Sequence, residues 1–322
     1  MGRPLKNATL RQLATFHALS RLGSITRTAE EMCLTQPAVS LQLSSLEDSA
    51  GVPLLARNAR GVRLTEAGLL LADYSARILA LCREAGEAMA AQQGQLAGTL
   101  RVGAVTTAEQ VLPQLLLEFC KPHPLVKVSL SVGNRAEIVG QLATQEIDLA
   151  VMGRPPAELE TTSAVFASHP MAFVAAPEHR LMRAAGLSLS DIRACNLLVR
   201  ERGSGTRSTV EELFKRADLD FAFGGEMSSN EAIKQMCRAG FGVAFLSLHA
   251  CALELEAGLL ALLPLPGYPV LRDWRVIRLA GRSVPAAARM FEDFLLANGK
   301  ASIERQFAWK SSADRGAEAA TA

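Results

Sequence analysis

The sequence predicts an α+β protein with three parts: a small helical head that ends in a two-stranded ribbon, one long helix, and a two-lobed α/β body. Three observations support this prediction. Short amphipathic segments fill the first 65 residues, a heptad pattern without proline follows, and strand and helix patterns alternate from about residue 98. The 322 residues are enough for two or three domains, and the apolar fraction of 49% supplies their cores.

Charge is unevenly distributed along the chain. The formal net charge is +2, but residues 1–65 hold eight Lys or Arg against four Asp or Glu, which leaves +4 there and −2 in the remainder. A basic end on a near-neutral body is typical of a DNA-binding head joined to a sensing body. The six cysteines are scattered without a CxxC pair, and neither a His cluster nor a long apolar run is present. We therefore expect a cytoplasmic protein without a metal site, cofactor or membrane span.

The stretch from Gly23 to Glu47 predicts two short helices joined by a tight turn. Ser24 is suited to cap the first helix and Thr35 the second, and Pro37 is tolerated in the first turn of the second helix. A preceding amphipathic helix would complete a small core. The positions expected to face this core are Leu10, Leu13, Phe16, Leu19, Ala29, Met32, Val39, Leu43 and Leu46.

The outer face of the second helix is small, polar and uncharged, which suits base edges better than solvent. Gln pairs with adenine, Ser with either class of base, and an apolar side chain with a thymine methyl group. We therefore predict that this helix lies in the major groove of DNA, the alternative being an ordinary helical hairpin in a core. The predicted base-contacting residues are Gln36, Pro37, Ser40, Leu41 and Ser44.

The segment after the second helix predicts a two-stranded wing. Arg57, Arg60 and Arg63 flank Gly61 there, and Thr65 is placed to cap the next helix. Arginines on a ribbon beside a recognition helix are suited to hold DNA phosphates, a role we assign to Arg57 and Arg63. The predicted DNA-binding domain therefore spans about residues 1–65.

A single long helix is predicted over about residues 66–94. Apolar positions alternate in steps of four and three, which is the seam of a coiled coil. A seam of this length exceeds what a small head can cover, so we predict homodimers joined through this helix, with two recognition helices spaced for major grooves about 34 Å apart. The alternative is a helix that packs on its own body. The seam residues are Ala67, Leu71, Tyr74, Ile78, Leu81, Ala85, Ala88 and Gln92.

Residues 98–298 predict two linked α/β lobes. Strands at 100–104, 126–132 and 147–152 alternate with helices, which is typical of a parallel sheet. A second unit is expected to begin with the strand at 171–177 and to include a short strand at 221–223. Strand 274–280 and the helix at 284–296 then return to the first unit. Lobe I is thus predicted over about 98–166 plus 270–298 and lobe II over about 168–268, with a disordered tail at 299–322.

Hydroxyls, glycines and arginines gather where the predicted strands end and helices begin. Helix N-termini offer free N–H groups and the positive end of a dipole, and arginine forms paired bonds with carboxylate or phosphate. Ligands of such sheets bind beyond the carboxyl ends of the strands. We therefore predict an anionic effector in a cleft between the lobes. The candidate residues are Thr106, Thr107, Asn134, Arg135, Arg154, Arg202, Gly205, Thr206, Arg207 and Asn230.

The chain resembles the LysR-type transcriptional regulators over nearly its whole length. The similarity implies a winged helix-turn-helix head, a sensing body like periplasmic binding proteins, and dimers that pair into homotetramers on double-stranded DNA. Many relatives carry Arg or Lys where this chain has Leu41, which affects base preference there. The motif residues that carry the resemblance are Ala29, Glu30, Leu34, Thr35, Gln36, Pro37, Ala38, Val39, Ser40, Leu46, Glu47, Leu54, Arg57, Leu64, Thr65, Ala67 and Gly68.

The body is most similar to the CbbR type, which controls carbon-dioxide-fixation operons. The similarity lies in VGNRAE at 132–137, IDLAVMGRPP at 147–156, GSGTR at 203–207, MSSNEAIKQ at 227–235 and GVAFLS at 242–247. It implies a phosphorylated effector that reports on the Calvin cycle. Two alternatives stay open: a LysR-type regulator of another pathway that senses a carboxylate, and an enzyme. The enzyme is disfavoured because no GxxxxGK[ST], GxSxG, HExxH or Ser/His/Asp arrangement is present.

Overall fold

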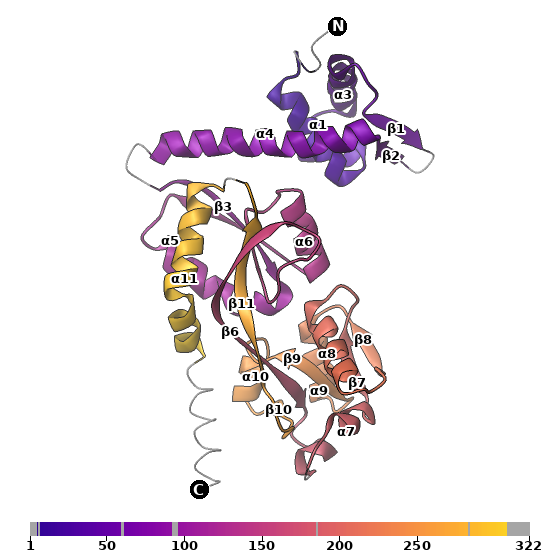
Figure 1. Ribbon diagram of the computed structural model, residues 1–322, viewed down its shortest axis with the longest axis vertical. Coiled ribbons are helices and arrows are strands. Elements are labelled where there is room, and N and C mark those ends of the chain that lie inside the picture. The colour runs from indigo at the N-terminus through magenta and orange to yellow at the C-terminus, as the bar shows by residue number, and fades with distance from the viewer. Residues whose placement is uncertain are drawn as a thin grey trace. The chain divides into compact units, whose positions relative to one another are not determined.

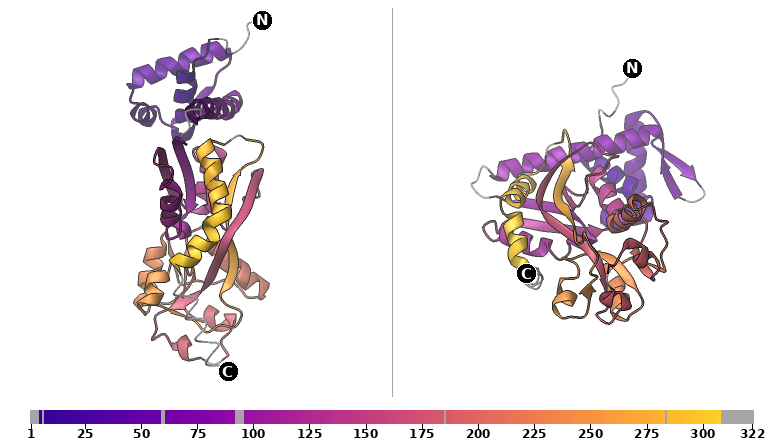
Figure 2. Two further views of the ribbon diagram at one scale, coloured as in Figure 1. Left: turned by 90° about the vertical axis from the view of Figure 1, so that its left-hand side faces the viewer. Right: turned by 60° about the horizontal axis from the view of Figure 1, so that its bottom comes forward.

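The computed structural model describes residue 5 and residues 7–58, 61–91, 96–184, 186–282 and 284–307, without the side chains of 57, 58, 61, 84, 87, 88, 90 and 91. Backbone contacts divide the chain into two units, residues 1–94 and 95–322, and each is considered by itself. The ribbon in Figure 1 and the two further views in Figure 2 show that both units combine helices with strands. The predicted α+β class is confirmed.

The first unit contains three short helices, a ribbon and a long helix. These are α1 (Leu10–Leu22), α2 (Ile25–Glu31), α3 (Gln36–Ala50), β1 (Leu55–Asn58), β2 (Gly61–Leu64) and α4 (Glu66–Ala91). As predicted, the hydroxyl of Ser24 accepts an N–H at the start of α2 and that of Thr35 does so for α3. Gly23 and Gly51 end α1 and α3 in the left-handed conformation, where glycine avoids the steric cost of a Cβ atom.

One apolar cluster holds the three short helices together and fixes which face of α3 is left outside. Phe16, Val39 and Leu46 are fully buried in it. The carboxylate of Glu47 accepts the N–H groups of Leu54 at 2.7 Å and Leu55 at 3.0 Å, so the end of α3 holds the start of the ribbon. β1 pairs with β2 antiparallel, with Asn58 opposite Gly61. The helix-turn-helix and the wing therefore form as predicted.

The long helix α4 divides its apolar positions between two faces. Leu71 is buried in the head core, and Ala67 and Ile78 pack against the same cluster. Leu70, Tyr74 and Leu81 are instead 62%, 48% and 59% exposed. The predicted single seam is therefore wrong in detail, because its first turns are needed to cover the head. Ala88 and Gln92 of the predicted seam lie outside the described side chains and the described residues respectively.

The second unit is built on a nine-stranded sheet in the order β4-β3-β5-β11-β6-β9-β7-β8, with β10 beside β6. In lobe I, the parallel strands β3, β4 and β5 carry α5 and α11 on one face and α6 on the other. This is the predicted parallel sheet. The elements of lobe I are β3 (Gly98–Val105), the 3-10 turn η1 (Thr106–Ala108), α5 (Leu112–Cys120), β4 (Val126–Gly133), α6 (Arg135–Ala143), β5 (Leu149–Met152) and α11 (Ala286–Gln306).

Lobe II has its own parallel strands, because β7 pairs in parallel with both β8 and β9. α8 packs on one face of these strands and α9 on the other, each over a separate apolar cluster. The elements of lobe II are η2 (Arg180–Arg183), α7 (Leu189–Arg193), β7 (Leu197–Arg200), α8 (Gly205–Arg216), β8 (Gly225–Met227), α9 (Asn230–Arg238), β9 (Val243–Ser247), α10 (Ala252–Glu256) and β10 (Ala261–Leu262).

Two long strands cross between the lobes, β6 (Thr161–Ala175) and β11 (Val270–Leu279), and they pair with each other antiparallel. Figure 1 shows both strands running from lobe I into lobe II. The strand predicted at 171–177 does enter lobe II, since residues 171–174 pair with β9, but it is the second half of a strand that starts at Thr161. The alternation of buried residues is weak in the first half of β6, which hides it from a pattern search.

Two further boundaries differ from the prediction. The short strand of lobe II lies at Gly225–Met227 rather than 221–223. Helix α11 runs to Gln306 instead of ending before a tail at 299, because Ser302 and Ile303 are buried against lobe I. A Cβ atom at Gly299 would lie 2.6 Å from the Phe166 ring, so glycine permits the close contact between helix and sheet. The remainder of the predicted tail, 308–322, lies outside the described residues.

Candidate DNA-binding surface and anion-binding cavity

The outer face of α3 is exposed, as a recognition helix requires. Every predicted base-contacting side chain lies on it: Gln36, Pro37, Ser40, Leu41 and Ser44. Leu41 is 72% exposed, a high value for an apolar side chain. The opposite face is fixed to α1 by two hydrogen bonds, from Gln12 Nε2 to Ser45 Oγ at 2.9 Å and from Thr15 Oγ1 to Gln42 Oε1 at 2.6 Å. The face available to DNA is therefore set by the buried face.

The wing places Arg63 on β2 with its side chain exposed, as a phosphate contact needs. Arg57 lies on β1, opposite Val62, but its side chain is outside the described ones. Arg60 falls outside the described residues. The assignment of Arg57 and Arg63 to phosphates therefore stays a prediction.

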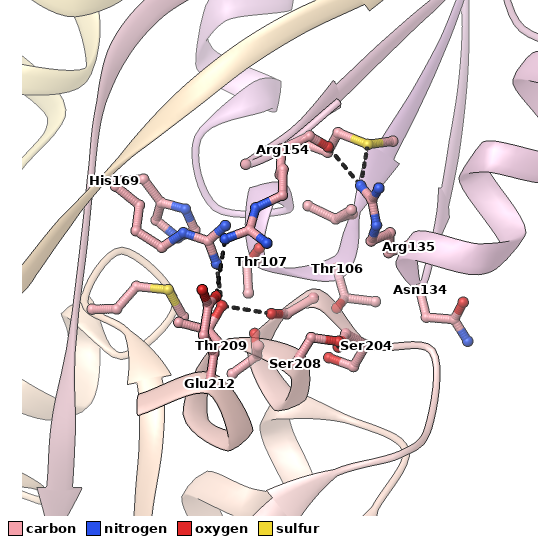
Figure 3. Close-up of a pocket in the computed structure, with 17 residues that line it drawn as sticks. Thr106, Thr107, Asn134, Arg135, Arg154, His169, Ser204, Ser208, Thr209 and Glu212 are labelled. Atoms are coloured by element: carbon pink, nitrogen blue, oxygen red, sulfur yellow. Dashed lines mark hydrogen bonds and ion pairs between the residues drawn. The ribbon is translucent and has the colours of Figure 1, made fainter. Parts of the chain in front are cut away.

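In the second unit a cavity opens between the two lobes. Lobe I contributes the ends of β3 and β5 and the start of α6, and lobe II contributes the first turns of α8 (Figure 3). Seven of the ten residues predicted from the sequence line it. They are Thr106, Thr107, Asn134, Arg135, Arg154, Gly205 and Thr206.

Three arginines surround this cavity: Arg135, Arg154 and Arg272. Arg135 is held by the backbone oxygens of Arg154 at 2.5 Å and Pro155 at 3.1 Å. Desolvation by burial lowers the pKa of Arg135 and of Arg272, and the positive charge of Arg154 lowers both further. Like charges held together at the edge of a cavity favour a bound anion, because the anion relieves their repulsion.

Two hydrogen-bonded pairs join these arginines to α8. Arg154 Nη2 donates to Glu212 Oε2 at 3.1 Å, and Arg272 Nη1 donates to the hydroxyl of Thr209. In Figure 3, Arg154 and Glu212 face each other across the cavity. The guanidinium of Arg154, followed by the charge of Arg216, lowers the pKa of the Glu212 carboxyl. Glu212 is therefore ionised at neutral pH. Among the described residues that line the cavity, it is the one carboxylate.

The start of α8 is directed at the cavity. Its first residues, Gly205 and Thr206, line the space, and Ser204 caps the helix without a hydrogen bond from its side chain. The first N–H groups of a helix have no partner within the helix, and the helix dipole makes that end positive. Gly203, with φ +91°, makes the turn just before this helix, a conformation that favours glycine. The arrangement matches the predicted anion site.

A buried arginine, Arg200 at the end of β7, connects the lobes beside the cavity. Its Nη1 donates to Thr106 Oγ1 of lobe I at 2.9 Å and to Asn230 Oδ1 of lobe II at 2.6 Å. The carboxylate of Glu201 holds the other side of the guanidinium at 2.8 and 3.0 Å. Because arginine only donates, Thr106 accepts from it, and the hydroxyl proton of Thr106 is left to donate elsewhere.

Three predicted effector residues do not line the cavity. Arg202 is exposed outside it, and Asn230 is engaged with Arg200. Arg207 turns into lobe II, where its Nε donates to Glu211 at 2.8 Å and its Nη1 to Glu226, with the guanidinium 5.0 Å from the ring of Phe223. These two carboxylates offset the desolvation of Arg207 and raise its pKa. The predicted role of Arg207 was wrong because the third residue of α8 faces the strands.

The fold also brings to the cavity residues that were not predicted from the sequence. His169 on β6 and Arg272 on β11 lie on the crossing strands, whose pairing the sequence did not reveal. Ser208, Thr209 and Glu212 follow the GSGTR motif on α8. The spacing of four from Gly205 to Thr209 and from Ser208 to Glu212 was available as a signal, since such positions share one helix face.

The described residues contain no group of three or more His, Cys, Asp or Glu side chains able to hold a metal ion. Among the helices in the described ranges, none is long and apolar enough to cross a membrane. Burial raises the pKa of Cys237 to about 12, so this thiol is not a ready nucleophile. The described side chains that line the cavity supply mainly hydroxyl and guanidinium donors and positive charge.

A head with an exposed recognition helix and a two-lobed body with an anion-suited cavity define a ligand-responsive DNA-binding protein. The comparisons agree. Residues 10–69 match the family of bacterial regulatory helix-turn-helix proteins of the LysR type, and residues 93–300 match the LysR substrate binding domain. The chain belongs to the LysR family of transcriptional regulators, so the resemblance predicted from the sequence is confirmed.

Particular relatives lie among regulators of the CbbR type, which was also predicted. The chain is 39% identical to the transcriptional activator CmpR of Synechocystis, over 92% of this chain and 98% of CmpR. It is 41% identical to the regulator CbbR of Rhodospirillum rubrum, over 89% and 96% of the two chains. Among solved structures, the Synechocystis CcmR regulatory domain in complex with 2-PG has a TM-score of 0.59 and 34% identity, covering 62% of this chain and 96% of that domain.

Proposed function

We propose that this regulator controls carbon-dioxide-fixation genes and that an anionic, phosphorylated metabolite bound in the interlobe cavity is its effector. The resemblance to CbbR supports the pathway, and so does 37% identity to the RuBisCO operon transcriptional regulator of Allochromatium vinosum, over 90% of this chain and 96% of that protein. The related CcmR domain is described in complex with 2-PG, which supports a small effector. The alternatives are a carboxylate effector from another pathway and an enzymatic body.

The observation that carries the effector class is the convergence of charge on the cavity. Arg135, Arg154 and Arg272 line it with one carboxylate, Glu212, so these four side chains carry a formal charge of +2. The N-terminus of α8 and the hydroxyls of Thr106 and Thr206 add donors. A phosphate monoester is close to doubly charged at neutral pH, whereas a simple carboxylate carries a single charge. The phosphate monoester is therefore the better match.

The DNA-binding role rests on the exposed face of α3 and on Arg57 and Arg63 of the wing. We propose that homodimers form through α4, whose exposed side chains Leu70 and Leu81 offer apolar area for a second copy. Pairing of these dimers into tetramers is part of the same proposal, on the basis of family resemblance. Binding of the anion would favour one arrangement of the lobes, and DNA affinity would change with it.

Titration calorimetry on the full-length protein tests the effector class. The panel contains 2-phosphoglycolate, 2-phosphoglycerate, ribulose 1,5-bisphosphate, inorganic phosphate, glycolate and acetate. We expect a phosphorylated organic acid or sugar to bind most tightly. Replacing Arg272 with Gln should weaken that binding about tenfold or more, because a charge-assisted hydrogen bond contributes about 1.5–3 kcal/mol.

Arg275→Gln is the matched control, because Arg275 lies on the same strand and pairs with Asp273 at 2.9 Å rather than lining the cavity. The affinity of Arg275→Gln for the phosphorylated ligand should equal that of the unchanged protein. Preferential binding of glycolate or acetate would contradict the phosphorylated effector and favour a carboxylate-sensing regulator. Conversion of a bound compound to product during the titration would favour the enzyme.

A further inference from the structure

We infer that Glu212 is a specificity-determining residue that competes with the anionic group of the effector for the guanidinium of Arg154. The inference rests on the proposed function, because it concerns the same cavity. Glu212 is not among the effector residues predicted from the sequence. Among the described residues that line the cavity, Glu212 is the one carboxylate, and the other charged side chains there are arginines that favour a bound anion.

The two partners come from opposite lobes. Arg154 follows β5 of lobe I, and Glu212 lies two turns into α8 of lobe II. Their side chains meet at 3.1 Å, with 60% of the Arg154 side chain and 35% of the Glu212 side chain exposed. This exposure leaves the outer side of the guanidinium accessible from the cavity. An anion can thus approach Arg154 while Glu212 still holds it.

Arg154 has less local support than the other arginines of the cavity. Arg135 is fixed by two backbone oxygens, and Arg272 by Thr209. The guanidinium of Arg154 instead donates to the side chain of Glu212, on the other lobe. Arg154 is therefore the arginine whose guanidinium would change partner most readily when an anion arrives.

Glu212 has a second partner to which it can retreat. Arg216, one turn further along α8, donates to Glu212 Oε1 at 2.6 Å, while Arg154 holds Oε2. Loss of Arg154 therefore does not leave the Glu212 carboxylate without a counter-ion. When the effector replaces Glu212 on Arg154, the free energy lost is that of one partly exposed ion pair, and such pairs are weak.

The exchange has a consequence for ligand selection. A group that displaces Glu212 must bind Arg154 more strongly than a carboxylate does, and a phosphate with several charged oxygens meets this condition. A ligand with a single carboxylate offers Arg154 no more than Glu212 already provides. Glu212 therefore selects phosphate over carboxylate, because it yields Arg154 to the first and keeps it from the second.

Calorimetry on full-length Glu212→Gln with 2-phosphoglycolate and glycolate tests the inference. We expect both ligands to bind more tightly than to the unchanged protein, by about two- to fivefold for an ion pair of this exposure. The preference for the phosphorylated ligand should narrow, because glycolate, which does not displace Glu212, gains the whole contact with Arg154. The phosphorylated ligand already has that contact and is relieved only of the cost of displacement. Glu211→Gln is the matched control: Glu211 is the preceding residue, 42% exposed, and pairs with Arg207 outside the cavity.

A double-mutant cycle separates direct competition from the general field of a negative charge. In an Arg154→Gln background, Glu212→Gln should bring no further gain in affinity. A gain that persists there would overturn the competition for Arg154. Weaker binding to Glu212→Gln alone would also overturn it, since the carboxylate would then be accepting a hydrogen bond from the ligand.

A measurement without effector separates this inference from the proposed function. Phenylglyoxal modifies accessible arginines, and mass spectrometry reports the rate at each site. Arg154 should react faster in Glu212→Gln than in Glu211→Gln, and an equal rate would overturn the ion pair that the inference requires. A different outcome is that Arg154 reacts faster in Glu212→Gln but neither the unchanged protein nor any variant binds an anion. That outcome would overturn the proposed effector site, and the competition with it.

Discussion

At the scale of single residues, the same type of side chain has different roles according to its neighbours. Arg154 is largely exposed and faces the cavity, Arg200 is buried and joins the lobes, and Arg207 packs inside lobe II against two carboxylates. Sequence proximity does not distinguish them, since Arg200 and Arg207 lie within eight residues of one another around the GSGTR motif. What differs is the direction that the backbone gives to each side chain.

The exposed polar residues of α3 lead to a prediction about base recognition. Gln36→Ala should reduce the ratio of operator to random-DNA affinity by about five- to a hundredfold, because one good base contact contributes about 1–3 kcal/mol of discrimination. Affinity for random DNA should change little. Fluorescence anisotropy with an operator selected from a random library, and with scrambled DNA, measures both.

Arg63→Gln provides the contrasting control on the wing. A lost phosphate contact should weaken binding to both DNAs alike and reduce the slope of log affinity against log salt by about one. Full discrimination by Gln36→Ala would show that α3 is not the recognition helix.

At the scale of elements, α4 has two tasks that divide its apolar residues. The turns near Leu71 complete the head core, and Leu70, Tyr74 and Leu81 remain exposed. At 100° per residue these three positions fall on one side of the helix. An isolated exposed leucine is ordinary, but an aligned stripe on a long helix needs a partner.

Leu81→Glu should convert the proposed dimer to a monomer at micromolar concentration, because it places a charge within this apolar stripe. Sedimentation velocity measures the change. Leu69→Glu is the matched control: Leu69 is equally exposed, at 61% against 59%, but lies on a different side of α4. If Leu81→Glu remains dimeric and Leu69→Glu dissociates, the interface lies on another face of α4.

At the scale of the whole molecule, side-chain hydrogen bonds between the lobes surround the interlobe cavity. Arg200 bonds Thr106, Arg154 bonds Glu212, and Arg272 bonds Thr209. We expect a ligand that inserts among these pairs to change the balance between arrangements of the lobes. Coupling to DNA then follows by linkage: the factor by which effector changes DNA affinity equals the factor by which DNA changes effector affinity.

Saturating 2-phosphoglycolate should therefore change the operator Kd by a measurable factor, and couplings between sites are commonly about 5- to 150-fold. The operator should change the effector Kd by the same factor. Anisotropy and calorimetry measure the two separately. Arg272→Gln, which binds effector poorly, should show the unliganded DNA affinity throughout. A factor of one in both directions would mean that the cavity does not communicate with the head.

The sequence by itself determined the parts that depend on local pattern. Caps, the turn and the apolar spacing of α3 are properties of neighbouring residues, so the helix-turn-helix and its exposed face were predicted correctly. The parallel strands of lobe I and the strand ends that carry Thr106, Asn134 and Arg154 were predicted for the same reason. Side chains at the ends of parallel strands meet at one edge of a sheet whatever the details of packing.

Only the tertiary structure decided what depends on distant pairing. The register of β6 against β11 brings His169 and Arg272 to the cavity, and the packing of α8 turns Glu212 toward it and Arg207 away. Likewise α11 continues to Gln306 because lobe I buries its last turns. The direction of a side chain relative to a distant strand is set by register and burial, which local periodicity does not contain.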